Sequence, residues 1–114
     1  MKVTYKAIAR HSGYWILVIL DLSDRSKADR TEGLQFKNFL KQRGFQVLHP
    51  SLYARFAFTE ASADSVCNSV LKFSPKKGKM SVLRMTDAQF QGGKRISRGK
   101  FSPMPAPLSL VTIV

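Results

Sequence analysis

A short apolar run that ends at an acidic side chain constrains this chain more than any other feature. Residues 14–20 read Tyr-Trp-Ile-Leu-Val-Ile-Leu; Asp21 comes next and Asp24 follows shortly after. A continuous apolar run of this length, bounded by turn-forming residues, predicts a strand that is buried on both faces. Asp21 then lies at the rim of a sheet, either as a ligand-binding group or as an ordinary residue that ends the strand. We interpret Asp24 as the N-cap of a following helix, with a role as a ligand as the lesser alternative.

The residues after this strand alternate between helical and extended patterns. Over 25–43 the apolar side chains Phe36, Phe39 and Leu40 share one side of a predicted helix, and Gly44 follows where a C-cap glycine belongs. Thr59 is a suitable N-cap for a second helix. The other predicted elements are strands over 45–49, 52–58 and 80–86, the second helix over 60–73 and a short helical turn over 86–90.

The order strand, helix, strand, strand, helix, strand is typical of ferredoxin-like folds, which carry two helices on one face of a sheet. We therefore predict an α+β, ferredoxin-like β-α-β-β-α-β domain over residues 14–90. Residues 1–13 form a basic N-terminal extension, and residues 91–114 form a flexible basic linker and an additional C-terminal strand. Because the first strand is apolar on both sides, the second face of the sheet needs a cover, and we expect a homodimer to provide it.

The net charge predicts the kind of partner. The chain carries 19 Lys and Arg against 7 Asp and Glu, a formal charge of +12. Such an excess favours a polyanion, with nucleic acid as the first expectation and an anionic membrane surface as the second. No stretch approaches the length of a membrane span, and the apolar run near the start lacks the features of a signal peptide, so we predict a cytoplasmic protein without a membrane partner. A single cysteine, Cys67, excludes an internal disulfide.

The first predicted helix concentrates part of this charge. Four cations fall within roughly 80° of one another on the side away from the apolar residues, and no acidic residue lies among them. A solvated face is the ordinary explanation, but with the basic chain as a whole we favour phosphate binding. The predicted nucleic-acid-binding residues are these four with Arg25, beside Asp21, and two lysines after the second helix: Arg25, Lys27, Arg30, Lys37, Lys41, Lys76 and Lys77.

Four groups of residues resemble the second core family of CRISPR-associated proteins, the small subunit of the spacer-acquisition complex. They occur in the family's order and together span roughly residues 14–90. The groups are Ile19-Leu20-Asp21-Leu22, Phe36-x-x-Phe39-Leu40-x-x-x-Gly44-Phe45, Leu48-x-x-Ser51-Leu52-Tyr53-x-Arg55 and Leu83-x-Met85-Thr86-Asp87-x-Gln89-Phe90.

The resemblance implies a role for Asp21, because the family's metal-binding aspartate lies at this position. One carboxylate is a poor site for Mg²⁺, whereas a two-fold dimer brings two copies of Asp21 together. A divalent ion relieves the repulsion between them and can generate a nucleophile for a phosphodiester. The resemblance thus implies a metal-dependent endonuclease, acting on RNA or double-stranded DNA, with Asp21 as metal ligand and catalytic residue and Mg²⁺ shared between two subunits.

The resemblance also implies a scaffold. Family members bridge copies of the CRISPR integrase subunit and hold duplex DNA destined to become a new spacer. In such members the terminal strand docks on the partner subunit, which here assigns docking to the apolar residues Leu108, Leu110, Val111 and Ile113. The alternative is a non-catalytic RNA-binding module on the same fold. It is disfavoured because residues 79–86 contain none of the aromatic side chains on which such modules stack bases.

Overall fold

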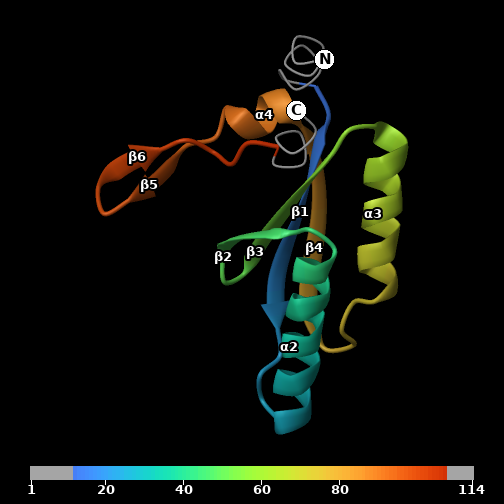
Figure 1. The fold of residues 1–114 in the computed structure, drawn as a ribbon. Helices are drawn as coiled ribbons and strands as arrows, with labels where there is room; N and C mark the ends of the chain where they lie inside the picture. Colours follow the sequence, from blue (N-terminus) through green and yellow to red (C-terminus); the bar gives the residue numbers. More distant parts are fainter. Residues whose placement is uncertain (1–11, 108–114) are drawn as a thin grey trace.

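The computed structural model describes residues 12–107, and its centre is a four-stranded antiparallel sheet (Figure 1). Strand β1 (Tyr14–Leu22) lies between β3 (Leu52–Ala57) and β4 (Gly78–Thr86), and β2 (Gln46–His49) forms the edge next to β3. The order β2-β3-β1-β4, with every neighbouring pair antiparallel, is that of two interleaved β-α-β units. The predicted ferredoxin-like α+β fold is therefore confirmed.

Helices α2 (Lys27–Gln42) and α3 (Glu60–Lys72) cover one face of the sheet. Thr59 caps α3 as predicted, since its hydroxyl accepts a hydrogen bond from the Ser62 backbone N–H. The prediction for α2 was wrong by two residues: Ser26, and not Asp24, is the N-cap, and its side chain accepts from the Asp29 backbone N–H at 3.0 Å. Both residue types cap well, and only the local backbone decides which of them reaches the first turn.

The core between the helices and the sheet follows the alternation along β1. Ile16, Val18 and Leu20 point towards the helices and are at most 6% exposed. They pack against side chains of both helices and of β3, namely Phe36 and Leu40 of α2, Ala63, Val66 and Val70 of α3, and Tyr53 and Ala57 of β3.

The other face of the sheet is covered at one end by the chain itself. Trp15 is fully buried beneath the short helix α4 (Asp87–Gln91), where its ring stacks on Phe90 with centroids 4.0 Å apart. Its indole N–H donates to the buried Asp87 carboxylate at 2.7 Å. Met104 packs against the same cluster. Trp15 is therefore buried within the chain itself, and the homodimer expected to cover this face stays a prediction.

The rest of this face is open. Ile19 of β1 is 41% exposed and Leu83 of β4 is 45% exposed. By alternation both lie on the sheet face opposite the helices, further along the sheet from Trp15. We call the surface formed by Leu17, Ile19 and Leu83 the open sheet face.

The segment after α4 is more ordered than the predicted linker. Strands β5 (Arg95–Ser97) and β6 (Lys100–Ser102) pair as a hairpin that projects from the domain (Figure 1). Both turn residues, Arg98 and Gly99, have positive φ, which matches the twist of a two-residue hairpin turn. The predicted terminal strand over 108–114 lies outside the described residues, as does most of the N-terminal extension. No helix within residues 12–107 is long and apolar enough to cross a membrane.

Candidate nucleic-acid interface and metal site at the end of strand β1

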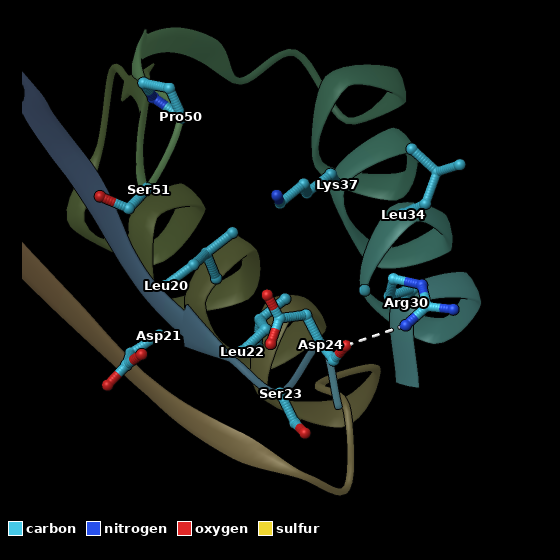
Figure 2. A pocket seen from close by; sticks show the side chains of 11 residues that line it. Leu20, Asp21, Leu22, Ser23, Asp24, Arg30, Leu34, Lys37, Pro50 and Ser51 are labelled. Carbon is cyan, nitrogen blue, oxygen red and sulfur yellow. Dashed lines mark hydrogen bonds between the residues drawn. The ribbon is translucent and has the colours of Figure 1, made fainter. Parts of the chain in front are cut away.

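Asp21 lies at the end of β1, where the register pairs it with Lys79 of β4. Its neighbours Leu20 and Leu22 point towards the helices, and Figure 2 shows the Asp21 side chain on the opposite side of the strand. Asp21 is exposed. It therefore shares the sheet face that carries Ile19 and Leu83, and it lies beyond them at the end of the strand.

Two hollows flank this strand end, and Asp21 lines both. The first, of about 440 Å³, lies between β1 and α2 and includes Arg30 and Lys37 (Figure 2). The second, of about 700 Å³, lies between the end of β1 and the start of β4 and includes Arg25 and Lys77. Four of the seven predicted nucleic-acid-binding residues thus line hollows at this strand end, although the Asp21 carboxylate points to the side of β1 away from Arg30 and Lys37 (Figure 2).

Arg30 is held in place by the turn that follows β1. Its guanidinium donates to the Asp24 backbone carbonyl at 3.1 Å, and this contact appears as the dashed line in Figure 2. Asp24, the residue predicted to cap α2, thus contributes its backbone to the cationic side of the site. Lys27 and Lys41 lie on α2 outside the two hollows, and both are exposed.

The acidic residues of α2 face the other way. Asp29 accepts a hydrogen bond from the Ser23 hydroxyl at 2.8 Å and lies 3.8 Å from the Lys77 ammonium. The hydrogen bond from Ser23 and then the charge of Lys77 hold the pKa of Asp29 below its usual value. Glu32 accepts from the Lys76 backbone N–H at 3.2 Å.

This arrangement leaves the cations on the opposite side of α2 unbalanced. Within the described part of the chain, ion pairs form only at Lys77 and Arg84, so none of the four predicted cations of α2 is paired with a carboxylate. The residues Lys27, Arg30, Lys37 and Lys41 form what we call the basic face of α2. Their binding of phosphate stays a prediction.

The side chains available at the end of β1 determine whether one protomer could bind a metal ion there. Among residues 12–107, no group of three or more His, Cys, Asp and Glu side chains is placed to share an ion. Asp21 is the one acid on the open side of the strand end, and its oxygen atoms are the ligands that Mg²⁺ prefers. The donor set of one protomer therefore does not fit a resident ion, and an ion shared by two copies of Asp21 stays a prediction.

Sequence reasoning missed two features that lie away from the Asp21 end of β1. Asp87 is 2% exposed and ties α4 to Trp15, and the capping pattern Thr86-x-x-Gln89 was the available signal for that helix. Arg43 and Arg55 line a separate cavity on the helix side of the sheet. Arg55 is named in the sequence only within the third group of the family resemblance, without a binding role.

The fold and the site define a small ferredoxin-like protein that presents exposed carboxylates and a basic helix at one end of its central strand. No family model matches the chain. It is 35% identical to the CRISPR-associated endoribonuclease Cas2 of Paracidovorax avenae over 77 residues, which cover 68% of this chain and 71% of the relative. It is 31% identical to the CRISPR-associated endoribonuclease Cas2 2 of Rhodospirillum rubrum, over 75% of this chain and 77% of the relative. The chain belongs to the Cas2 family of CRISPR-associated proteins.

Proposed function

We propose that this protein is a CRISPR adaptation protein: a homodimer that binds duplex DNA as a scaffold for the CRISPR integrase during spacer acquisition. We further propose that paired Asp21 side chains bind Mg²⁺ and make the dimer a phosphodiester endonuclease. The observation that supports the proposal is the position of Asp21, exposed at an end of β1 whose two hollows are lined by four cations. The relatives are named endoribonucleases, which supports phosphodiester hydrolysis as the chemistry.

The balance of charge favours binding over turnover. Each protomer offers only Asp21 and Asp24 as free carboxylates at this strand end, but a whole helix face of cations for phosphate. When bound, Mg²⁺ would supply charge neutralisation and activation of water for attack on the phosphodiester. The chain itself would hold the ion through Asp21 and position a phosphate through Arg25, Arg30 and Lys37. We infer that Asp21 acts with a second copy, because no group of three or more His, Cys, Asp and Glu side chains within residues 12–107 is placed to share an ion.

The open sheet face supports the dimer. Exposed apolar side chains that lie side by side on a sheet mark a surface for a partner. A two-fold axis would place the same patch of each protomer against the other, so that Ile19 and Leu83 become covered. Because Asp21 lies on that face, the same axis brings its two copies near one another.

We expect Leu83→Lys to convert the dimer into a monomer, since it would bury a charge without a partner in the interface. The matched control is Leu71→Lys, which changes a similarly exposed leucine of α3 (55% exposed) away from this face. Analytical ultracentrifugation measures the outcome, with circular dichroism to confirm that both variants are folded. Dimers in both variants would rule out the open sheet face as the interface, and cleavage by a monomeric variant would rule out the shared ion.

The partnership with the integrase rests on the family and on residues beyond the described range. Leu108, Leu110, Val111 and Ile113 are the proposed docking residues, and the described tail leads to them. Gln91 of α4 donates to the Pro105 backbone carbonyl at 2.9 Å, which fixes the segment just before that terminus against the domain. The docking strand would then start from a defined place near α4.

The basic face of α2 predicts strongly salt-dependent binding. The logarithm of the association constant for duplex DNA should fall linearly with the logarithm of the salt concentration, with a slope of about −0.9 per phosphate contact. Lys37→Gln and Lys41→Gln should each reduce that slope by about 0.9 for every phosphate that the variant no longer neutralises. Fluorescence anisotropy over a NaCl series measures it, with Lys72→Gln on α3 as the control of equal charge change. Slopes unchanged from the wild type would place the DNA elsewhere.

The RNA-binding alternative gains no support from the sheet. Modules of that kind present aromatic side chains on an open sheet surface for base stacking. Here Trp15 is fully buried under α4, Phe56 packs against it, and the exposed part of the face carries Ile19 and Leu83. The aromatic side chains of the sheet are thus used in packing.

A further inference from the structure

Two arginines share a cavity on the helix side of the sheet. Arg43 caps the C-terminal end of α2, and Arg55 projects from β3. Both line two adjoining hollows, of about 230 Å³ and about 370 Å³, and Ser62 of α3 lines both as well. The cavity therefore lies between the end of α2, the middle of β3 and the first half of α3.

The two positive charges in this cavity repel each other. Arg55 is half-buried, and its burial followed by the nearby charge of Arg43 lowers the pKa of its guanidinium. Arg84 lies on the same sheet face, but its charge is balanced by ion pairs with both Glu60 and Asp64 of α3. Within residues 12–107, neither Arg43 nor Arg55 has a carboxylate partner.

Helix α3 separates its acids from its hydroxyls. Glu60 and Asp64 lie on the edge of the helix that faces Arg84, and Ser62, Ser65 and Ser69 lie about 150° away on the edge that lines the smaller hollow. The arginine cavity is therefore walled by two guanidinium groups and three hydroxyls, all hydrogen-bond donors, and by no acidic side chain. Guanidinium groups bind phosphoryl oxygens in pairs of parallel hydrogen bonds, and serine hydroxyls can add single ones.

We propose that the cavity of Arg43 and Arg55 is a binding site for a phosphoryl group. An anion there would relieve the repulsion between the two guanidinium groups and supply the partner that the chain does not provide. The phosphoryl group can be a free phosphate ion or a phosphodiester of bound nucleic acid, and the latter source rests on the proposed function.

The site is distinct from that of Asp21. In the register of the sheet, Arg55 lies opposite Ile16, five residues before Asp21 along β1. At about 3.4 Å per residue, this separates the two positions by about 17 Å along the strand. The two also lie on opposite faces of the sheet. A polynucleotide that reached both would wrap around the domain, so the cavity would extend the contact surface beyond the basic face of α2.

The first experiment uses inorganic phosphate and does not require nucleic acid binding. The midpoint of thermal unfolding of the full-length protein should rise as phosphate replaces chloride at constant ionic strength. Arg55→Gln and Arg43→Gln should each abolish that rise, while Lys72→Gln should keep it. Arg43 is exposed, so its variant keeps the test valid if Arg55→Gln does not fold.

The second experiment tests the phosphodiester. For duplex DNA, the salt slope should be smaller by about 0.9 in Arg43→Gln than in the wild type, with Lys72→Gln again unchanged. A loss of the phosphate effect alone identifies a free anion as the ligand, and a reduced slope identifies the nucleic acid. If both arginine variants behave as the wild type in both measurements, the proposal is overturned, and this outcome leaves the Asp21 site and the basic face of α2 untouched.

Discussion

Asp21→Ala is expected to abolish Mg²⁺-dependent cleavage of nucleic acid while leaving the protein folded and able to bind DNA. The side chain is exposed and makes no hydrogen bond or ion pair in the described part of the chain, so its removal should change the free energy of unfolding by about 0.5 kcal/mol or less. Loss of a residue that only supports a metal ligand costs about 10–100-fold, and loss of the ligand itself should exceed this.

Binding should respond in the opposite direction to cleavage. The substitution removes a negative charge from a chain whose formal charge is already +12, so affinity for duplex DNA should stay the same or rise. Cleavage and anisotropy measured side by side on one preparation separate the two effects. Asp24→Ala is the comparison of equal charge change, because Asp24 holds Arg30 through its backbone carbonyl, which the substitution keeps. Unchanged cleavage in Asp21→Ala would remove Asp21 from the site.

A second readout does not depend on activity. If two copies of Asp21 face each other, they repel in a chelating buffer, and Mg²⁺ relieves that repulsion. The midpoint of thermal unfolding of the wild-type dimer should therefore rise with Mg²⁺, and that of Asp21→Ala should be independent of it. A wild type that responds to Mg²⁺ in this way but does not cleave would be a metal-bound scaffold.

Local patterns were sufficient to predict the helices and strands of the ferredoxin-like domain, but not the hairpin of β5 and β6. The apolar run of β1 and the apolar stripes of α2 and α3 indicate which segments are strand or helix and which side of each is buried. The bounds of these elements in the structure agree with the predicted ones to within a few residues. The wrong N-cap predicted for α2 has a local cause. Asp24 and Ser26 both carry a side chain that can accept from the first turn, and only the backbone path after β1 selects Ser26.

Long-range contacts set the limit of prediction. The hydrogen bond from Trp15 to Asp87 joins residues 72 positions apart, so nothing near β1 indicates that α4 covers that end of the sheet. The proximity of Arg43 and Arg55 also depends on a long-range contact, because it requires the end of α2 to lie next to the middle of β3. Asp21 could be placed at the rim because strand alternation and the end of the apolar run are both local.

Gly78 holds the start of β4 against the backbone that carries Asp21. Its φ is +92°, and a Cβ added there would lie 2.7 Å from the Asp21 carbonyl oxygen and 2.7 Å from the Leu22 Cα. Since these are backbone atoms, no side-chain rotation relieves the contact. Gly44, at the end of α2, has nearly the same φ of +88°, but its added Cβ would meet only side-chain atoms of Arg55, at 3.7 Å and beyond.

Substitution of the two glycines by alanine therefore distinguishes two costs: both variants have a strained backbone, but only the Gly78 variant has a steric clash with backbone atoms. Gly44→Ala should cost about 1–2 kcal/mol, the penalty of a left-handed backbone for an L-residue. Gly78→Ala should cost that amount and about 1–3 kcal/mol more for the overpacked strand pair, which is a large part of the stability of a small domain. Denaturant unfolding monitored by circular dichroism measures both, and equal costs would contradict the close approach of β4 to β1.

The steric clash at Gly78 should also lower the rate of cleavage. To accommodate a Cβ at Gly78, the end of β1 must move away from β4, and Asp21 must move with it. At a temperature where both variants are fully folded, Gly78→Ala should cleave more slowly than Gly44→Ala, while the two bind duplex DNA with the same salt slope, because the basic face of α2 is not displaced. A Gly78→Ala variant that is destabilised but cleaves normally would show that the position of Asp21 is set by its partner protomer and not by β4.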